Sequence, residues 1–586
     1  MPAPTTRPSV LLTTEGTYPF EGGGVTTWAD VVIKGLPDVD FHLLAVTGST
    51  ALRLHKEMPP HVRAIQTVPL FGSAEPTEFT RHDEPFSTTV LRRARTTRGM
   101  VERRFVPLLE RFLAALERPE AAGWAEAELI RDLNRYFVRL DHRATFRSEA
   151  TWNAFRDTIL AQEAAAGADG VETTLGDLVQ ALRWLYSFLL PITLPVPRTD
   201  VAHATLAGFA GLAGVISKLE YGTPFVVTDH GIYLRERYIA MSAASESCFL
   251  KRFLLRLVHL VSRVCYVVAD QVSPVCNHNS RWELKMGVTP DRIRTIYNGI
   301  DTSAFQVPEA EPEGRRPTVV TAARVFPLKD IETLIRACDV TRRRVPDVHF
   351  VVFGANWVDE PYTARCEALI DELGVRDHFT FAGYHSNPSE LYHEGDVFAL
   401  SSISEGFPFS VIEAMACGRP VVATDVGGVK EALVGGVGIV VPPRGFEPLG
   451  DGLADLLLDD ARRAELARLG RERVVQEFDV SQMLDAHRIT YRHYAGLPTD
   501  GPLPPAMAEP ASAGDGQASD APAWIAAPAS TRQRGERPSR RLAPGAEAET
   551  PEETFAQDAT GVRDEAESPA EASGDADAPR ALPEAA

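Results

Sequence analysis

The chain has 586 residues, of which 44% are hydrophobic and 24% charged, and at roughly 100–200 residues per domain this length indicates two or three globular domains. Its formal net charge of −20 argues against a nucleic-acid-binding protein, which would carry a basic face. The six cysteines form no CxxC pair and no Cys/His cluster with zinc spacing, so they fit a reducing compartment. With no recognisable signal segment and no uninterrupted apolar run of membrane-spanning length, we expect a cytoplasmic protein.

The amino-terminal region opens with a strand, a glycine turn and a helix. The expected strand covers residues 10–12, the turn is Gly22-Gly23-Gly24, the helix starts near Val25 and a second strand covers residues 41–46. This order opens a parallel α/β sheet. We therefore expect a Rossmann-like domain over residues 8–306.

A different pattern interrupts this domain from about residue 71 to residue 190. Long charged segments with helical spacing, such as residues 101–116 and 126–140, replace the alternation of strands and helices. We predict a mostly helical insertion, with acceptor recognition and partner docking as its two candidate roles. Strand-like runs then return at residues 201–204, 225–228 and 271–273.

A second α/β region follows a linker at residues 308–317. Helices of roughly 8–15 residues separate its expected strands, which is the spacing of βαβ units. The expected strands cover residues 318–322, 348–353, 379–381, 397–400, 421–423 and 438–441. We predict a doubly wound domain over residues 317–480, with its ligand at the carboxyl ends of the strands.

The folded part is expected to end with a closing helix at residues 481–496. The remaining residues, 497–586, are rich in Ala, Pro, Glu, Asp, Ser and Gly. From residue 501 onward they include 16 acidic and seven basic side chains. Because so few large apolar residues cannot offset the ordering entropy, we predict that this tail is disordered.

Two glutamates eight positions apart, Glu405 and Glu413, form the first candidate for chemistry. They follow the expected strand at 397–400, and Gly406 and Pro408 hold the first of them in a loop before a helix. A carboxylate can accept hydrogen bonds from the vicinal hydroxyls of a sugar or a ribose. Taken singly, each glutamate is better explained as a capping or solvent-facing residue.

Cations and glycines form the other candidates. Arg324 and Lys329 follow the strand at 318–322 and precede a helix, a position that suits a pyrophosphate. Gly23 and Gly24 would let backbone N–H groups approach a phosphate. His230 ends another strand and could donate to a sugar hydroxyl or a phosphate. The ordinary alternatives are a basic surface loop, a simple tight turn and a buried histidine.

These four sites gain weight because all of them follow strands, in two separate α/β regions. A ligand gripped between the two regions would meet cations at one end and carboxylates at the other. That arrangement matches a molecule with a pyrophosphate and hydroxylated sugars. No P-loop and no GxSxG elbow occurs in the chain, which argues against a P-loop NTPase and an α/β-hydrolase.

The carboxyl-terminal half resembles the retaining glycosyltransferases of family 4. The residues that carry the resemblance are Arg324 and Lys329, the pair Glu405 and Glu413, the turn 425–428 (DVGG) and the segment 298–301 (NGID). The amino-terminal half is similar to the PelF-like members of that family, through residues 11–20 and 228–237 and the long helical insertion. The resemblance covers roughly residues 8–495.

The resemblance implies a GT-B fold, with two Rossmann-like doubly wound domains facing a cleft. It also implies that Arg324 and Lys329 hold the donor diphosphate, that Glu413 binds the ribose and that Glu405 binds the donor sugar. His230 would lie near the donor sugar and the acceptor. Gly23 and Gly24 would approach the diphosphate or the sugar. The expected substrate-binding set is completed by Asn298, Gly406 and Phe407.

The expected reaction is transfer of a sugar from a UDP-sugar donor, with UDP-glucose as first candidate, to a polysaccharide acceptor in Pel-like exopolysaccharide synthesis, with retention of configuration. No metal and no other cofactor is expected. Inner-membrane polysaccharide synthase components are the expected partners. Two readings compete with this one. The chain could be a sugar-nucleotide epimerase of the same fold, or a non-catalytic nucleotide-sugar-binding scaffold of a membrane synthase.

Overall fold

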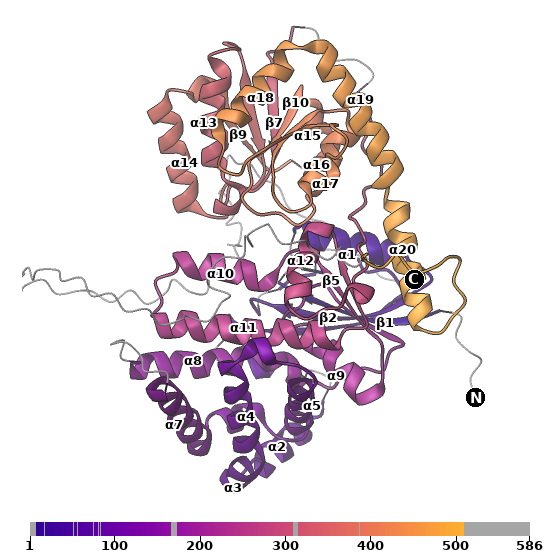
Figure 1. Ribbon diagram of the computed structural model, residues 1–586. Coiled ribbons are helices and arrows are strands. Elements are labelled where there is room, and N and C mark those ends of the chain that lie inside the picture. Colours follow the sequence, from indigo (N-terminus) through magenta and orange to yellow (C-terminus); the bar gives the residue numbers. More distant parts are fainter. Residues whose placement is uncertain are drawn as a thin grey trace, which may run out of the picture.

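A computed structural model describes residues 7–508, apart from residues 17, 21, 51, 55, 56, 74, 80, 82, 83, 166–172, 309–313 and 386. Most of the predicted tail, residues 509–586, and the middle of the predicted linker lie outside the described residues. Within the described part the chain forms two α/β domains, one above the other in Figure 1.

The first domain is built on a six-stranded parallel sheet with the order β3-β2-β1-β4-β5-β6. Its strands are β1 (Ser9–Glu15), β2 (Asp40–Thr47), β3 (Val62–Pro69), β4 (Val201–Ala204), β5 (Phe225–Asp229) and β6 (Gln271–Pro274). Strands β1, β4, β5 and β6 are almost wholly buried, because helices cover both faces of a parallel sheet. Strand β3 was not predicted; it lies at the edge of the sheet, and two of its residues, Arg63 and Ala64, are exposed.

The second domain repeats this topology with the order β12-β11-β10-β7-β8-β9. Its strands are β7 (Thr318–Ala322), β8 (His349–Phe353), β9 (Phe379–Gly383), β10 (Val397–Leu400), β11 (Val421–Thr424) and β12 (Ile439–Val441). In each sheet the strand order reverses beside the first strand, between β1 and β4 and between β7 and β10. Ligands of doubly wound sheets bind beyond the carboxyl ends of the strands at such a point.

The helices of the first domain flank its sheet. They are α1 (Gly24–Gly35), α9 (Leu212–Tyr221), α10 (Tyr233–Ala243), α11 (Cys248–Val268), α12 (Asn277–Lys285) and the 3-10 turn Pro290–Arg292. The longest, α11, lies between the sheet and the helical insertion (Figure 1). Among the described helices, none has both the length and the hydropathy of a membrane-crossing segment.

Helices dominate the region predicted as an insertion. They are α2 (Phe86–Arg95), α3 (Arg98–Met100), the π-helical segment Val101–Phe105, α4 (Val106–Glu117), α5 (Trp124–Arg139), α6 (His142–Phe146), α7 (Glu149–Ala165), α8 (Leu175–Phe188) and the 3-10 turns Pro76–Phe79, Pro119–Ala121 and Leu190–Thr193. They share one hydrophobic cluster with the sheet above them, so the insertion extends the core of the first domain.

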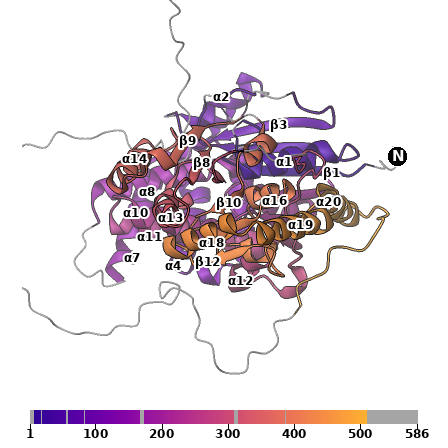
Figure 2. The same cartoon turned by 90° about the horizontal axis from the view of Figure 1, so that it is seen from above.

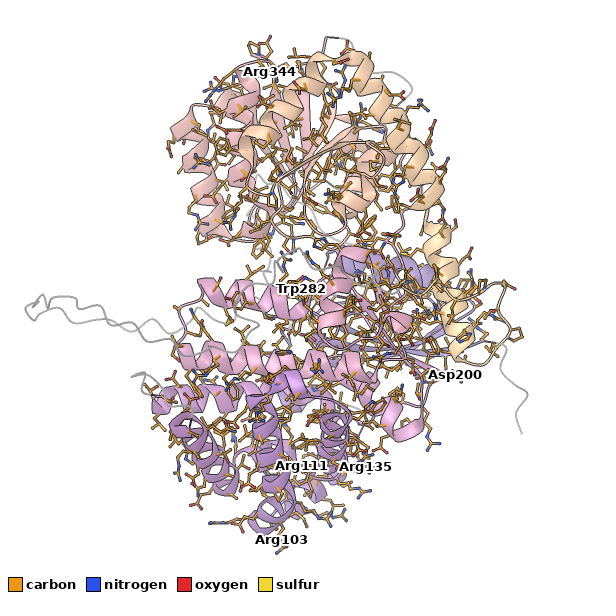
Figure 3. The ribbon with its side chains drawn as sticks, viewed as in Figure 1. Arg103, Arg111, Arg135, Asp200, Trp282 and Arg344 are labelled. Carbon is orange, nitrogen blue, oxygen red and sulfur yellow. The ribbon has the colours of Figure 1, made fainter. Side chains whose placement is uncertain are left out.

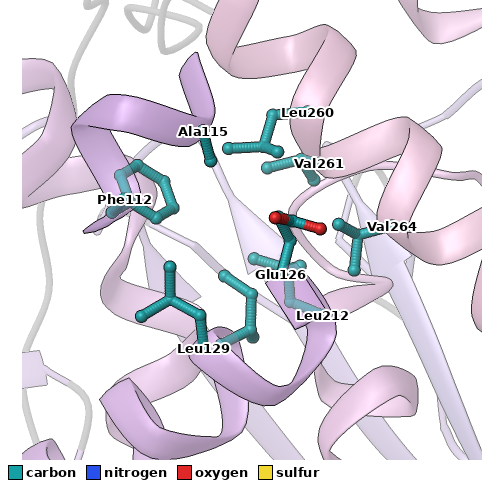
Figure 4. A pocket seen from close by; sticks show the side chains of 9 residues that line it. Phe112, Ala115, Glu126, Leu129, Leu212, Leu260, Val261 and Val264 are labelled. Atoms are coloured by element: carbon teal, nitrogen blue, oxygen red, sulfur yellow. The ribbon is translucent and has the colours of Figure 1, made fainter. Parts of the chain in front are cut away.

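A small apolar hollow lies where α4, α5, α9 and α11 meet (Figure 4). Its charged lining residue is Glu126, whose carboxylate accepts a hydrogen bond of 2.7 Å from the N–H of Gly123 at the start of α5. Glu126 therefore caps a helix there. The hollow lies between the helical insertion and helices α9 and α11, on the side of the first domain away from the second (Figure 1).

The helices of the second domain are α13 (Ile331–Arg342), α14 (Glu360–Leu373), α15 (Pro388–His393), α16 (Phe409–Ala416), α17 (Val429–Ala432), α18 (Phe446–Leu458), α19 (Asp460–Glu477) and the 3-10 turns Pro327–Lys329 and Arg376–His378. After α19 the chain turns back, and α20 (Val480–Tyr494) lies against the first domain (Figure 1). Met483 and Tyr491 of α20 share a buried cluster with Trp28 and Val32 of α1.

The segment after α20 also contacts the first domain. We had assigned residues 497–508 to the tail, but the N–H of Met507 donates to the carbonyl of Ile293 at 2.8 Å. Arg294 donates to the carbonyl of Pro504 at 2.5 Å. The ordered chain therefore continues at least to residue 508.

The two chain segments that connect the domains are bonded to each other. The N–H of Ile300 donates to Phe478 at 3.0 Å, and the N–H of Val480 donates back to Ile300 at 2.9 Å. Gly299 has no room for a side chain, because a β-carbon there would lie 2.9 Å from the Cα of Val480. Both connections between the domains are thus pinned at one place.

Candidate functional site

The four clusters singled out from the sequence follow strands β1, β5, β7 and β10. In Figure 1, helices α1 and α12 of the first domain face α16 and α17 of the second, so these strand ends meet where the two domains approach each other. Figure 2 shows α1 and α16 close together from above.

Lys329 and Glu405 form the centre of the site. The ammonium of Lys329 lies 2.6 Å from Oε1 of Glu405, and the hydroxyl of Ser402 donates to the same oxygen at 2.6 Å. The two loops are also joined by two further hydrogen bonds, since the hydroxyl of Ser401 donates to the carbonyl of Lys329 at 2.8 Å and the N–H of Ile403 donates to that of Leu328 at 2.9 Å. The loops after β7 and β10 therefore hold one cation and one carboxylate in contact.

Arg324 lies on the same loop as Lys329 but is differently placed. Its side chain is exposed and has no hydrogen bond or ion pair with any residue that the structure describes. The backbone on each side is fixed, because the N–H of Ala323 donates to Phe353 and that of Val325 to Ala355, both at 2.9 Å. A rigid loop thus presents an uncompensated guanidinium, the group best suited to bidentate binding of phosphate.

Glu413 lies in the second turn of α16. Its Oε2 accepts a hydrogen bond of 2.5 Å from the hydroxyl of Tyr392 on α15. Burial raises the pKa of the Glu413 carboxyl, and the hydrogen bond from Tyr392 acts against that rise. The tyrosine fixes one oxygen, which leaves the other able to accept hydrogen bonds from ligand hydroxyls.

Two helices start at the interface without a side-chain cap. Helix α1 follows Gly23 and helix α16 follows Pro408, and neither cap residue accepts a hydrogen bond through its side chain. A β-carbon on Gly24 would lie 3.9 Å from the ring of Phe409, the first residue of α16. Uncapped N–H groups at a helix start favour anions.

The first domain grips the loop that carries Glu405. The guanidinium of Arg235 on α10 donates to the hydroxyl of Ser404 at 2.5 Å. Gly406 packs so closely on the backbone carbonyl of His230 that a β-carbon there would overlap it. The thiol of Cys276 lies 3.5 Å from the carbonyl of Gly406. The position of Glu405 thus depends on both domains.

The turn at residues 425–428 supports the same loop from the other side. Gly427 adopts φ 54° and packs against the carbonyls of Glu405 and Gly406, where a β-carbon would clash. The N–H of Gly428 donates to the carbonyl of Gly406 at 2.7 Å. The two glycines of this motif therefore serve the geometry of the loop.

Asn298 and Phe407 were predicted to bind substrate, and the structure places both side chains inside the protein. Each is 3% exposed. The amide of Asn298 donates to the carbonyl of Phe407 at 2.9 Å, and the ring of Phe407 packs on Tyr297 and Phe478. These contacts anchor the loop that carries Glu405.

His230 lies in a buried group of aromatic rings. Its ring meets Trp28 edge-on at a centroid distance of 4.8 Å, and Nε2 is buried without a hydrogen-bond partner among the described residues. Burial, with a smaller effect from nearby His487, lowers the pKa of His230 to about 3. At neutral pH this imidazole is uncharged, so it can exchange hydrogen bonds but cannot act as a cation.

Two further histidines share this group, and no local sequence pattern indicated either of them. Trp28 also contacts His203 at 5.6 Å and His487 at 5.2 Å between ring centroids. His203 is bonded on both nitrogens, to Thr228 at 2.8 Å and to Tyr491 at 2.7 Å. Because His487 and Tyr491 come from α20, the carboxyl-terminal helix helps build the wall behind His230.

Helix α10 adds charged groups for which no role was predicted. Burial raises the pKa of Glu236, with Glu405 among the carboxylates that contribute. The pKa of Arg237 is raised, first by Tyr233 and also by Glu15 at the end of β1. The run Arg235-Glu236-Arg237 directly after a strand-end loop was the available signal for these residues.

A buried carboxyl pair lies beneath the His230 loop. Asp229 accepts a hydrogen bond of 2.7 Å from the hydroxyl of Tyr266. Burial raises the pKa of Asp229 to about 6, and burial with the neighbouring Asp229 raises that of Glu283 well above its ordinary value. Two carboxyls in one dry space favour sharing a proton, so this pair stays partly protonated at neutral pH.

The two halves of the chain match two different protein families. Residues 304–473 match the family described as Glycosyl transferases group 1, and residues 8–291 match a domain of unknown function, DUF3492. A GDP-mannose-dependent alpha-(1-6)-phosphatidylinositol monomannoside mannosyltransferase of Mycobacterium tuberculosis is 33% identical over 198 residues, which are 31% of this chain and 50% of that protein. The alpha-maltose-1-phosphate synthase of Mycolicibacterium smegmatis is 27% identical over 308 residues, 48% of this chain and 76% of that protein.

The chain spans about half the length of the mannosyltransferase relatives it matches. Among solved structures, sucrose-phosphate synthase from Thermosynechococcus elongatus has a TM-score of 0.53 at 18% identity, covering 84% of this chain and 100% of that one. HepE from Anabaena, solved with UDP and glucose, has a TM-score of 0.50 at 15% identity, covering 83% and 99%. The chain therefore has the GT-B fold, and the expected fold class is confirmed.

Proposed function

We propose that this chain, whose second domain carries the group 1 glycosyltransferase sequence, is a retaining glycosyltransferase that uses a nucleotide-sugar donor. The observation that supports it most is the contact of Lys329 with Glu405 at 2.6 Å, because the loop of Lys329 also carries Arg324 and the loop of Glu405 leads into α16, which carries Glu413. Cations and carboxylates placed side by side suit a diphosphate joined to hydroxylated sugars.

In this proposal Arg324 and Lys329 bind the diphosphate, and the uncapped starts of α1 and α16 add backbone donors. Glu413 accepts hydrogen bonds from the ribose and Glu405 from the donor sugar. As the bond from the anomeric carbon to the leaving phosphate oxygen breaks, negative charge develops on that phosphate. The two cations stabilise it without reorganising, and the proposal needs no metal.

Retention follows when the acceptor oxygen bonds to the anomeric carbon on the face that the phosphate leaves. The acceptor hydroxyl then gives its proton to the departing phosphate oxygen, so no separate nucleophile or base is required. The uncharged ring of His230 is suited to orienting a hydroxyl through hydrogen bonds. Contacts between the domains at Gly406 and Ser404 exclude water from the reacting atoms.

UDP-glucose is the first donor to test. The PelF-like segments of the amino-terminal half support this choice, whereas the names of the curated relatives include a GDP-mannose-dependent enzyme. The acceptor in this proposal is a growing exopolysaccharide of Pel type. Partner proteins of an inner-membrane synthase would bring the cytoplasmic enzyme to its acceptor.

Two alternatives use the same site. A sugar-nucleotide epimerase would need the same diphosphate contacts, and a non-catalytic scaffold would need only donor binding. The presence of all four motif residues favours an enzyme over a scaffold; they are Arg324, Lys329, Glu405 and Glu413. Product analysis distinguishes the possible reactions. Free sugar would indicate hydrolysis, an epimer would indicate epimerisation and a glycoside would indicate transfer.

The first experiment is calorimetric titration of the wild-type protein and Glu413→Ala with UDP, UDP-glucose, UDP-GlcNAc and GDP-mannose. Loss of charge-assisted hydrogen bonds to the ribose should weaken nucleotide binding by roughly 10–100-fold. Glu431→Ala is a matched control, because that carboxylate instead caps α12 through Asn277 and His278. Absence of binding by every nucleotide would refute the proposed donor site.

A further inference from the structure

Helix α2, in the helical insertion, has its polarity reversed. Its apolar residues face solvent, with Phe86 81% exposed, Val90 48% and Leu91 53%. The inner side holds Arg92, which is buried and paired with Glu84. Amphipathic surface helices normally bury the apolar stripe and expose the charges, so this helix presents an unburied apolar stripe.

Exposed arginines border that stripe. Residues three and four apart share one side of a helix, so Phe86, Val90 and Arg93 form one row and Leu91 and Arg95 the next. Arg93 and Arg95 are exposed and have no carboxylate partner among the described residues. We call Phe86, Val90, Leu91, Arg93 and Arg95 the α2 face.

The charge around the α2 face contrasts with the rest of the chain. Residues 86–101 contain four arginines and no acidic residue, whereas the whole chain has 80 acidic and 60 basic side chains. The neighbouring π-helical segment adds exposed Arg103 and Arg104. Figure 3 places Arg103 at the end of the molecule farthest from the second domain, and Figure 2 shows α2 at the rim.

We propose that the α2 face binds directly to the surface of an anionic lipid bilayer. Apolar side chains that enter the boundary between headgroups and acyl chains, flanked by arginines that meet lipid phosphates, are the two components of interfacial binding. The chain has a net charge of −20, so an anionic membrane repels the other faces of the protein. The basic α2 face therefore also determines how the protein is oriented on the membrane. Contact through α2 leaves the loops between the domains clear of the membrane.

This inference does not depend on the proposed reaction, because it concerns lipid contact by the protein itself. The test is co-sedimentation of the full chain with vesicles of phosphatidylcholine, with and without phosphatidylglycerol. We expect binding to the anionic vesicles only, with strong weakening near 1 M salt, where the screening length falls to about 3 Å. The proposed enzyme could fail its nucleotide titration without changing this result.

Two variants separate the contributions. Arg93→Gln with Arg95→Gln should weaken vesicle binding about 25-fold, at about fivefold for each arginine. Phe86→Ser with Val90→Ser should weaken it by roughly tenfold or more and should leave the salt dependence in place. The charge-matched control is Arg336→Gln with Arg344→Gln in the second domain, where Figure 3 shows Arg344 at the opposite end of the molecule.

Each remaining outcome overturns the proposal. No sedimentation with anionic vesicles would do so, as would equal binding to phosphatidylcholine alone or equal loss in the control variant. A photo-crosslinker at position 90 that captures residues 547–584 would show that the chain's own acidic segment covers the α2 face. Capture of an acidic partner protein, together with no binding to vesicles, would show that the α2 face binds a protein and not a lipid surface.

Discussion

The contact between Gly406 and the carbonyl of His230 gives the sharpest test of how the two domains cooperate. Gly406→Ala places a β-carbon where the carbonyl oxygen of His230 already lies, so the two loops must separate. The separation needed is about 1 Å, and a displacement of that size at a reacting centre costs roughly 100-fold in rate, or about 2.7 kcal/mol. We expect kcat/KM for sugar transfer to fall by that factor.

Nucleotide affinity should change much less, because Arg324 and Glu413 belong to the second domain and do not move relative to each other. The melting temperature should also stay within a few degrees, since a slight opening of the domains relieves the overlap. Gly470→Ala is the control, because its β-carbon would lie 3.6 Å from Met415 in ordinary contact. A Gly406→Ala enzyme with wild-type transfer rate would show that the observed contact is not part of the active arrangement.

Three further predictions follow from named contacts. Lys329→Ala should lower kcat by about 100–1,000-fold with a smaller change in KM, whereas Lys430→Ala, 73% exposed, should be nearly neutral in the same initial-rate assay. Because the pKa of Asp229 is raised to about 6 in the folded protein, the free energy of unfolding should fall as pH rises from about 4 to about 6. In thermal melts, Glu283→Gln should flatten that fall, because the glutamine gives Asp229 a fixed N–H donor. An unaltered pH profile would argue against a shared proton. Tyr491→Phe removes the 2.7 Å hydrogen bond to His203 and should cost about 1–3 kcal/mol in urea unfolding, more than Tyr494→Phe, whose hydroxyl lies 3.5 Å from its acceptor.

The sequence predicted those parts of the fold in which local pattern and burial agree. Residues 397–400 form β10 as expected, because a short apolar run between turn residues is typical of a strand buried on both faces. The edge strand β3 was missed for the opposite reason, since its exposed Arg63 and Ala64 interrupt the pattern. Strand β1 was recognised too short because the buried Thr13 and Thr14 are polar.

The candidate site was predictable where its residues follow the ends of recognisable strands. Lys329 and Glu405 could be assigned to strand ends, and the fold brings them together. The grip of Arg235 on Ser404 joins residues 169 positions apart, and no local pattern indicates such a pair. The meeting of His203 with Tyr491 spans 288 positions and depends on the return of α20. Phe407 and Asn298 were named for their place in motifs, yet their side chains fill the core around the loop.

The return of α20 also determines when the protein can finish folding. The sheet of the first domain is complete in sequence by Pro274, yet Trp28, Val32 and Ile33 keep an uncovered apolar surface until α20 arrives. During translation the whole second domain must leave the ribosome before that surface is covered. A fragment cut at residue 306 would therefore expose the surface to aggregation, and a separate peptide carrying residues 478–508 should restore its solubility by binding in place of α20.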